Sequence, residues 1–239
     1  MRIALIAPPF IAVPPKDYGG TELFVAQLAE GLQKTGVNVV VYANGESTVN
    51  VECRWTYEHS QWPIRGQDDA LLKDMDHTAW AVQEAARTCD VIHMQTAQGL
   101  TFSRFVSVPV VYTVHHPHQA KLSEFYARYP DVHYVAISEF QREQESMSRI
   151  RTILHGIDLS QYRLCEQKQQ YLSFIGRIAL HQRLLEYDRT IANDFRKFLI
   201  KNSANFFHVQ TITVGTHNCL GMNALQFFMS NFFKSIHDG

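Results

Sequence analysis

Short, mainly apolar runs, of which the first is unbroken, recur along the chain and alternate with segments of helical periodicity. The runs span 3–7, 37–43, 91–94, 109–114, 132–137 and 150–154. A run without a polar face is typical of a strand covered on both sides of a parallel sheet. Apolar residues spaced three and four apart predict helices over 21–35, 71–86 and 122–129. This alternation favours an α/β fold with a doubly wound parallel sheet.

Local signals place several element ends. Thr21 is a predicted N-cap, and Gly36 lies just past the first helix, where a residue with positive φ is often needed. Ser138 and Gln141 fit a capping box, in which the Ser138 hydroxyl accepts from the Gln141 amide and the glutamine side chain reaches back. A further strand is predicted over 53–57.

A second part of the chain begins near residue 166. We expect one Rossmann-like domain over 1–165 and an incomplete second α/β part over 166–239, with 155–170 as the linker. The pattern predicts strands at 171–175 and 208–214, and helices at 180–202 and 219–236.

Composition narrows the classes of function. Hydrophobic residues make up 46%, enough for a buried core, and the net charge of −1 gives no reason to expect nucleic acid as a partner. The four cysteines form no C-x-x-C pair, which favours free thiols in a reducing compartment. No apolar run reaches the length of a membrane span, so we expect a cytoplasmic protein, with peripheral membrane contact left open.

A glycine pair follows the first predicted strand, in the segment Tyr18-Gly19-Gly20-Thr21-Glu22. Paired glycines before a helix let backbone N–H groups approach a phosphate, and the helix dipole favours the negative charge. A flexible turn that merely feeds a helix is the alternative. The segment is not G-x-G-x-x-G, so it does not support a dinucleotide-binding oxidoreductase.

Three histidines follow the strand at 109–114, in the segment His115-His116-Pro117-His118. A metal site is one interpretation, but no Cys, Asp or Glu stands at ligand spacing nearby. A histidine that hydrogen-bonds a bound sugar or phosphate is a second, and a solvated loop is a third.

Three further residues follow predicted strands and could meet a ligand at the same sheet edge: Ser138, Gly156 and Arg177. A helix cap explains Ser138 on its own, and a tight turn explains Gly156. The guanidinium of Arg177 suits a pyrophosphate because its planar fork binds oxyanions in a bidentate manner. A surface arginine is the alternative.

The order and spacing of these segments resemble the GT-B glycosyltransferases of family 4. The resemblance covers roughly residues 1–179 and is carried by the segments 1–9, 18–22, 110–115, 136–138, 154–158 and 174–178. It implies two Rossmann-like domains, the first for the acceptor and the second for most of a nucleotide-diphosphate sugar. It also implies glycosyl transfer with retention of configuration, and no metal or other cofactor.

The resemblance also implies roles for individual residues. His115 is the expected catalytic residue and would contact the transferred sugar. The expected donor-binding residues are Gly19, Gly20, Thr21, Ser138, Gly156 and Arg177, with Arg177 stabilising the leaving pyrophosphate. Developing negative charge on a diphosphate requires N–H or cationic donors arranged around it in advance, which agrees with these roles.

Beyond residue 179 the sequence departs from the family pattern. Gln182 stands about where a phosphate-binding lysine is expected, and no glutamate follows Glu186, although the family carries a pair that holds the donor. We therefore expect a truncated or diverged second part. The alternative function is a catalytically inactive half-enzyme that binds an acceptor or a partner. A phenylalanine-rich tail would cover the face left open, or the chain would self-associate.

Overall fold

The computed structural model describes residues 1–64, 66–156, 171–177 and 208–215. The chain divides into two compact units, Met1–Leu159 and Ser160–Gly239. The domain boundary that the sequence predicts, between residues 165 and 166, lies outside the described residues.

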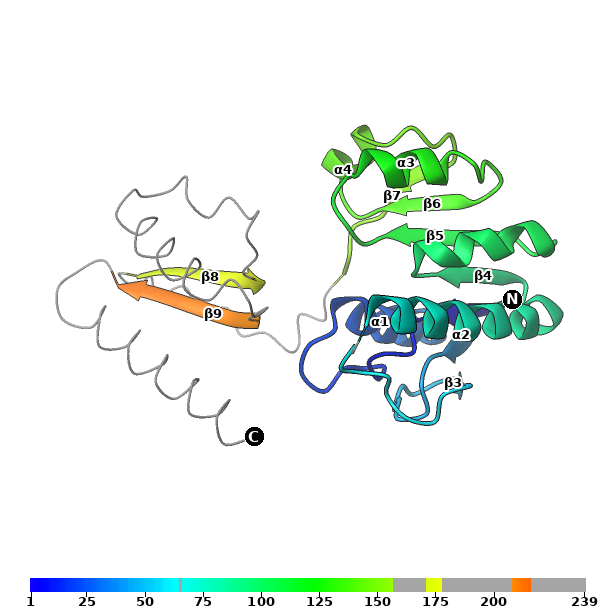
Figure 1. The fold of residues 1–239 in the computed structure, drawn as a ribbon, viewed down its shortest axis with the longest axis horizontal. Helices are drawn as coiled ribbons and strands as arrows, with labels where there is room; N and C mark the ends of the chain where they lie inside the picture. Colours follow the sequence, from blue (N-terminus) through cyan, green and yellow to red (C-terminus); the bar gives the residue numbers. More distant parts are fainter. Residues whose placement is uncertain (65, 157–170, 178–207, 216–239) are drawn as a thin grey trace. The chain divides into compact units, whose positions relative to one another are not determined.

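The first unit is built on a seven-stranded sheet in the order β3-β2-β1-β4-β5-β6-β7 (Figure 1). All six strand pairs are parallel. The chain moves outward from β1 to β3 and then returns to β4 on the other side of β1, which makes a topological switch point between β1 and β4. The predicted α/β doubly wound parallel fold is therefore confirmed. The strands are β1 (Arg2–Ile6), β2 (Asn38–Tyr42), β3 (Glu52–Arg54), β4 (Val91–Met94), β5 (Val110–Val114), β6 (His133–Ala136) and β7 (Ile150–Thr152).

Helices cover both faces of this sheet because alternate strand residues point to opposite sides. Leu5 of β1 belongs to an apolar cluster with three residues of α1, whereas Ala4 and Ile6 belong to a second cluster with residues of α2. Both clusters contain strand residues with almost no exposed surface. The helices are α1 (Gly20–Lys34), α2 (Gln67–Thr88), α3 (Ala120–Tyr126) and α4 (Glu139–Glu143), with a 3-10 helix η1 (Ala97–Phe105) after β4.

The predicted element ends are mostly confirmed, with one error. Gly36 has a φ of 83°, as the end of α1 requires. Ser138 accepts a hydrogen bond from the Gln141 amide at 3.1 Å, which confirms the cap. The prediction of Thr21 as the N-cap of α1 is wrong. The helix begins one residue earlier, with Gly19 as the N-cap and its carbonyl accepting from the Leu23 amide at 2.9 Å.

The second unit contains two described strands, β8 (Tyr171–Arg177) and β9 (His208–Gly215), which pair antiparallel. The predicted strands at 171–175 and 208–214 are thereby confirmed. The predicted helices at 180–202 and 219–236, and the phenylalanine-rich tail, lie outside the described residues. Within the described part of the chain, no helix is long and apolar enough to cross a membrane, and both described cysteines, Cys53 and Cys89, are free.

Candidate functional site

The carboxyl ends of the parallel strands meet at one edge of the first sheet, and the predicted loops follow those ends. The glycine loop follows β1, His115 follows β5, Ser138 follows β6, and Gly156 lies in the segment after β7. This edge next to a switch point is where open α/β sheets bind ligands. The structure therefore brings four of the predicted loops to one edge of the sheet.

The two glycines of the first loop have different surroundings. A Cβ added at Gly19 would lie 2.8 Å from the Cβ of Pro15 and 2.8 Å from Oε2 of Glu22, so this buried position has no room for a side chain. A Cβ at Gly20 would meet no atom within 4 Å, and Gly20 is exposed. Gly19 is thus needed by the fold itself, whereas the fold does not explain Gly20.

Glu22 lies in the first turn of α1 and is 6% exposed. Burial raises the pKa of its carboxyl group. A hydrogen bond from the backbone opposes this rise.

Phe24 connects the glycine loop to the histidines. Its ring stacks on His155, with the centroids 4.4 Å apart, and meets His115 edge-on at 5.0 Å. The rings of His115 and His155 are 5.7 Å apart. His155 precedes Gly156, so the first turn of α1 packs against two of the predicted loops at once.

His115 is held in a neutral state. Its Nε2 lies 2.7 Å from Oε1 of Gln95, the residue that follows β4. With the glutamine oxygen assigned as the partner, Nε2 carries the proton and Nδ1 keeps a lone pair. Burial, with repulsion from His155 and His116, lowers the pKa of His115 to about 4. At neutral pH the ring therefore acts as a hydrogen-bonding group rather than a cation.

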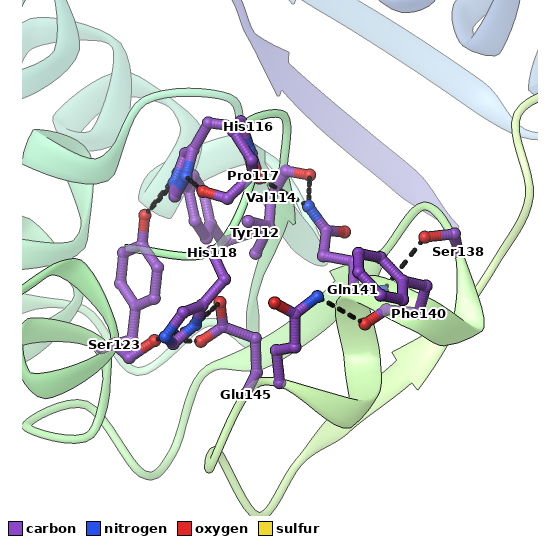
Figure 2. Close-up of polar contacts among 12 residues, drawn as sticks. Tyr112, Val114, His116, Pro117, His118, Ser123, Ser138, Phe140, Gln141 and Glu145 are labelled. Carbon is purple, nitrogen blue, oxygen red and sulfur yellow. Dashed lines mark hydrogen bonds and ion pairs between the residues drawn. The ribbon is translucent and has the colours of Figure 1, made fainter. Parts of the chain in front are cut away.

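Ser138 and Gln141 tie two of these loops together (Figure 2). The Gln141 amide donates to the carbonyls of Val114 at 3.1 Å and His116 at 2.7 Å. Its oxygen accepts from the Ile137 amide at 2.8 Å, which is the predicted reach back. Gln141 thus fixes the backbone on both sides of His115, and Ser138 supports it as the cap.

The other two histidines of the segment make structural contacts. His116 Nε2 lies 2.5 Å from the Tyr126 hydroxyl. His118 Nδ1 lies 3.1 Å from Oε1 of Glu145 and 3.2 Å from Oγ of Ser123, and Ser123 also bonds Glu145 (Figure 2). Serine and glutamate contact the same ring nitrogen, so the three residues cannot relay a proton as a catalytic triad does. Among the described residues, no group of three His, Cys, Asp or Glu side chains could hold a metal ion.

A cavity of about 560 Å³ opens beside His115, between the carboxyl ends of β1, β4 and β5 and the helices α2 and α3. Two of its polar lining residues, Asp74 of α2 and Gln95, are buried. The sequence analysis missed both. Gln95 could have been found because it directly follows a predicted strand. The apolar spacing within 71–86 does not mark Asp74. It predicts a buried face that includes Leu71 and Leu72, whose side chains are exposed, whereas Asp74 lies on the face that is buried.

Arg177 is the last residue of β8 and belongs to the second unit. Its predicted convergence with Gly19 and His115 stays a prediction. Ligand binding likewise stays a prediction for Gly20, Thr21, Ser138 and Gly156. Their position at the sheet edge does not test what they bind.

The fold and this sheet edge define a Rossmann-like domain of the kind that binds ligands at a switch point. The family model of Glycosyltransferase Family 4 matches residues 18–161, more than half of the chain. The chain therefore belongs to glycosyltransferase family 4.

Three solved structures illustrate the similarity in fold. HepE of Anabaena in complex with UDP and glucose is 17% identical, with a TM-score of 0.47, and the match covers 69% of this chain and 47% of that one. Sucrose-phosphate synthase of Thermosynechococcus elongatus is 15% identical, with a TM-score of 0.49, over 66% and 49% of the two chains.

AviGT4, a glycosyltransferase involved in avilamycin A biosynthesis, is 15% identical, with a TM-score of 0.47, over 88% and 64%. The chain spans about half the length of the first of these solved structures. No curated protein matches the sequence.

Proposed function

We propose that this chain is the acceptor-side part of a glycosyltransferase that moves a sugar, with retention of configuration, from a nucleotide-diphosphate sugar to an acceptor. The observation that carries the proposal is the packing of Phe24 against His115 and His155. This contact gathers the N-terminus of α1, the loop after β5 and the loop after β7 at one point of the sheet edge.

The residues at this point suit a sugar diphosphate. The exposed Gly20 begins a helix of 15 residues whose first amides lack partners within the helix, and such a terminus attracts phosphate. His115, neutral and fixed by Gln95, can accept a hydrogen bond from a sugar hydroxyl through Nδ1. The family resemblance implies that Arg177, which belongs to the second unit, supplies positive charge for the departing diphosphate. None of these roles needs a metal ion.

Binding tests the donor half of the proposal. Isothermal titration of the chain with UDP, GDP and ADP should give heat with at least one of them. Gly20→Ala should weaken that binding, because a methyl group blocks close approach of a phosphate to the backbone. The proposal is wrong if none of the three nucleotides binds.

Turnover tests the chemistry. The chain, incubated with the sugar nucleotide of the base that binds and with a hydroxyl-bearing acceptor such as maltose, should release the nucleoside diphosphate as the sugar forms a glycosidic bond to an acceptor hydroxyl. NMR of that glycoside should show the anomeric configuration of the donor. An inverted product would contradict the retaining mechanism.

The alternative function is a binding module without turnover. It is favoured by the absence of any glutamate after Glu186 and by Gln182 at the position of the expected lysine. Binding of an acceptor or nucleotide without release of product would support the module. Sustained transfer that is lost in Arg177→Ala would exclude it.

A further inference from the structure

The cavity beside His115 has walls of mixed character. Phe10, Leu122 and Phe125 give it apolar surface, and Asp74 and Gln95 give it buried polar groups. Its volume of about 560 Å³ lies in the range of small-molecule sites. A single water molecule fills roughly 30 Å³, so one ordered water does not account for the space.

Two polar atoms at this cavity lack partners. In the described part of the chain, Oδ1 of Asp74 and Nε2 of Gln95 make no hydrogen bond, although the two residues are only 5% and 6% exposed. An unmade hydrogen bond at a buried polar atom costs about 1–3 kcal/mol. Asp74 and Gln95 both line this cavity, so two residues of its wall each hold a polar atom that a bound group can satisfy.

The two atoms have opposite hydrogen-bonding character. The carboxylate oxygen of Asp74 accepts, and the amide nitrogen of Gln95 donates. A hydroxyl group both donates and accepts, so hydroxyl groups of one ligand satisfy both atoms. A carboxylate or phosphate oxygen would suit Gln95 but would be repelled by Asp74.

The charges of the residues that line the cavity also favour a neutral ligand. None of the described residues that line it is Lys or Arg. A phosphorylated ligand would therefore meet a carboxylate without a compensating cation. The phenylalanine rings offer apolar surface for the C–H face of a sugar or cyclitol ring.

We propose that Asp74 and Gln95 form a binding site for a neutral, polyhydroxylated ring, in which Asp74 accepts from and Gln95 donates to the ligand's hydroxyl groups. The site opens beside His115, and, resting on the function proposed above, the ligand is the acceptor of the glycosyl group. The acceptor is thus an unphosphorylated sugar or cyclitol, or the terminal unit of a longer glycan.

The protonation state of Asp74 agrees with its proposed role as a hydrogen-bond acceptor. Burial raises the pKa of Asp74 to about 6, although the hydroxyl groups of Thr96 and Thr78 oppose the change. At pH 7 the group is therefore mainly a carboxylate, which accepts a hydrogen bond from a sugar hydroxyl and remains costly to bury when nothing binds.

Saturation-transfer NMR on the full chain tests the site with glucose, maltose and myo-inositol as neutral probes and glucose 6-phosphate as the charged one. At least one neutral probe should bind, and glucose 6-phosphate should bind more weakly than glucose. Asp74→Asn should reduce the affinity about tenfold or more, the effect of losing one hydrogen bond to a charged group. Gln95→Glu, which keeps the acceptor for His115, should also reduce it.

Controls separate binding from folding. Asp69→Asn makes the same change at an exposed residue of the same helix, where the carboxylate pairs with Lys73 at 2.9 Å, and should leave binding unchanged. Asp74→Asn removes a buried charge, so its melting temperature should not fall. The inference is overturned if no neutral probe binds, if glucose 6-phosphate binds better than glucose, or if Asp74→Asn binds as tightly as the parent chain.

Binding of UDP, GDP and ADP, measured on the same samples, distinguishes this inference from the proposed function. Nucleotide binding without any neutral probe overturns the hydroxyl site alone. Neutral-probe binding that depends on Asp74, without nucleotide binding, supports the hydroxyl site and overturns the donor half of the proposed function.

Discussion

The imidazole of His115 and the side-chain amide of Gln95 meet at 2.7 Å, between the residues that follow β5 and β4. This contact joins the ends of two neighbouring strands and sets which nitrogen of the ring carries the proton. The ring faces the Phe24 contact, and the amide faces the cavity that also contains Asp74. The pair therefore lies where the proposed donor and acceptor sites adjoin.

Replacement of His115 by alanine should lower kcat/KM for sugar transfer about ten- to hundredfold, because one positioned hydrogen bond to the reacting sugar is lost. Steady-state kinetics with the sugar nucleotide measures the effect. His133→Ala changes an exposed histidine on the adjacent strand β6 and should leave kcat/KM unchanged. Equal kinetics for both variants would remove His115 from the site.

The neighbouring glycines should respond differently to alanine. Gly19→Ala places a methyl group 2.8 Å from the Cβ of Pro15, and such overpacking costs about 1–3 kcal/mol of unfolding free energy. Gly20→Ala meets open space at the start of a helix and should be neutral or stabilise by up to about 1 kcal/mol. Urea unfolding measures both changes.

Nucleotide affinity should separate the structural function of the glycine loop from its proposed phosphate-binding function. Gly20→Ala should lose about tenfold in affinity for the nucleoside diphosphate while its unfolding free energy is retained. A Gly20→Ala chain that is stable and binds the nucleotide normally would show that the glycine pair is only a turn.

Most strands of the first sheet were predictable because the sequence is mainly apolar there. The exception is β3 (Glu52–Arg54), which has two charged residues and overlaps the predicted strand at 53–57 by only two residues. The runs at 91–94 and 109–114 agree with β4 and β5 to within one residue. The start of α1 was not predictable in the same way. A threonine hydroxyl is the usual signal for an N-cap, but here a buried glycine takes the position because Pro15 and Glu22 leave no room for a side chain.

The loops of the site were predictable, but their contacts were not. Parallel strands bring their carboxyl ends to one edge, so Gly19, His115 and Gly156 follow from the pattern alone. The stacking of Phe24 on His155 depends on how α1 lies across the sheet. Asp74 reaches the cavity from a helix, and no local pattern reports the empty space beside it.

Gln141 should contribute more to stability than any other polar side chain of α4. Gln141→Ala removes three hydrogen bonds, to Val114, His116 and Ile137, and leaves buried backbone groups without partners. We expect a loss of about 2–4 kcal/mol in unfolding free energy. Gln144→Ala, at the C-cap of this helix, loses one exposed bond to Phe140 and should cost less than about 0.5 kcal/mol.

Stability should fall as the pH falls from about 6.5 to about 4. Burial lowers the pKa of His77 and His93 to about 4, and the pKa of His115 is lowered to a similar value. In this window the unfolded chain binds protons that the folded chain does not, so acid favours unfolding. Asp74 acts in the opposite sense, since its raised pKa lets the folded chain take up its proton first, but the histidines outnumber it.

The contribution of His93 to this pH dependence of stability can be measured separately. Its Nε2 lies 2.8 Å from the Thr113 hydroxyl, and His93→Gln keeps a hydrogen-bonding group there without a titrating one. Urea unfolding at a series of pH values should show a slope of unfolding free energy against pH that is smaller by about one proton in this variant. His133→Gln, at the exposed position on β6, should keep the parent slope. An unchanged slope in His93→Gln would mean that His93 takes up a proton as readily in the folded chain as in the unfolded one, which would contradict the desolvation of its ring near Phe24 of α1.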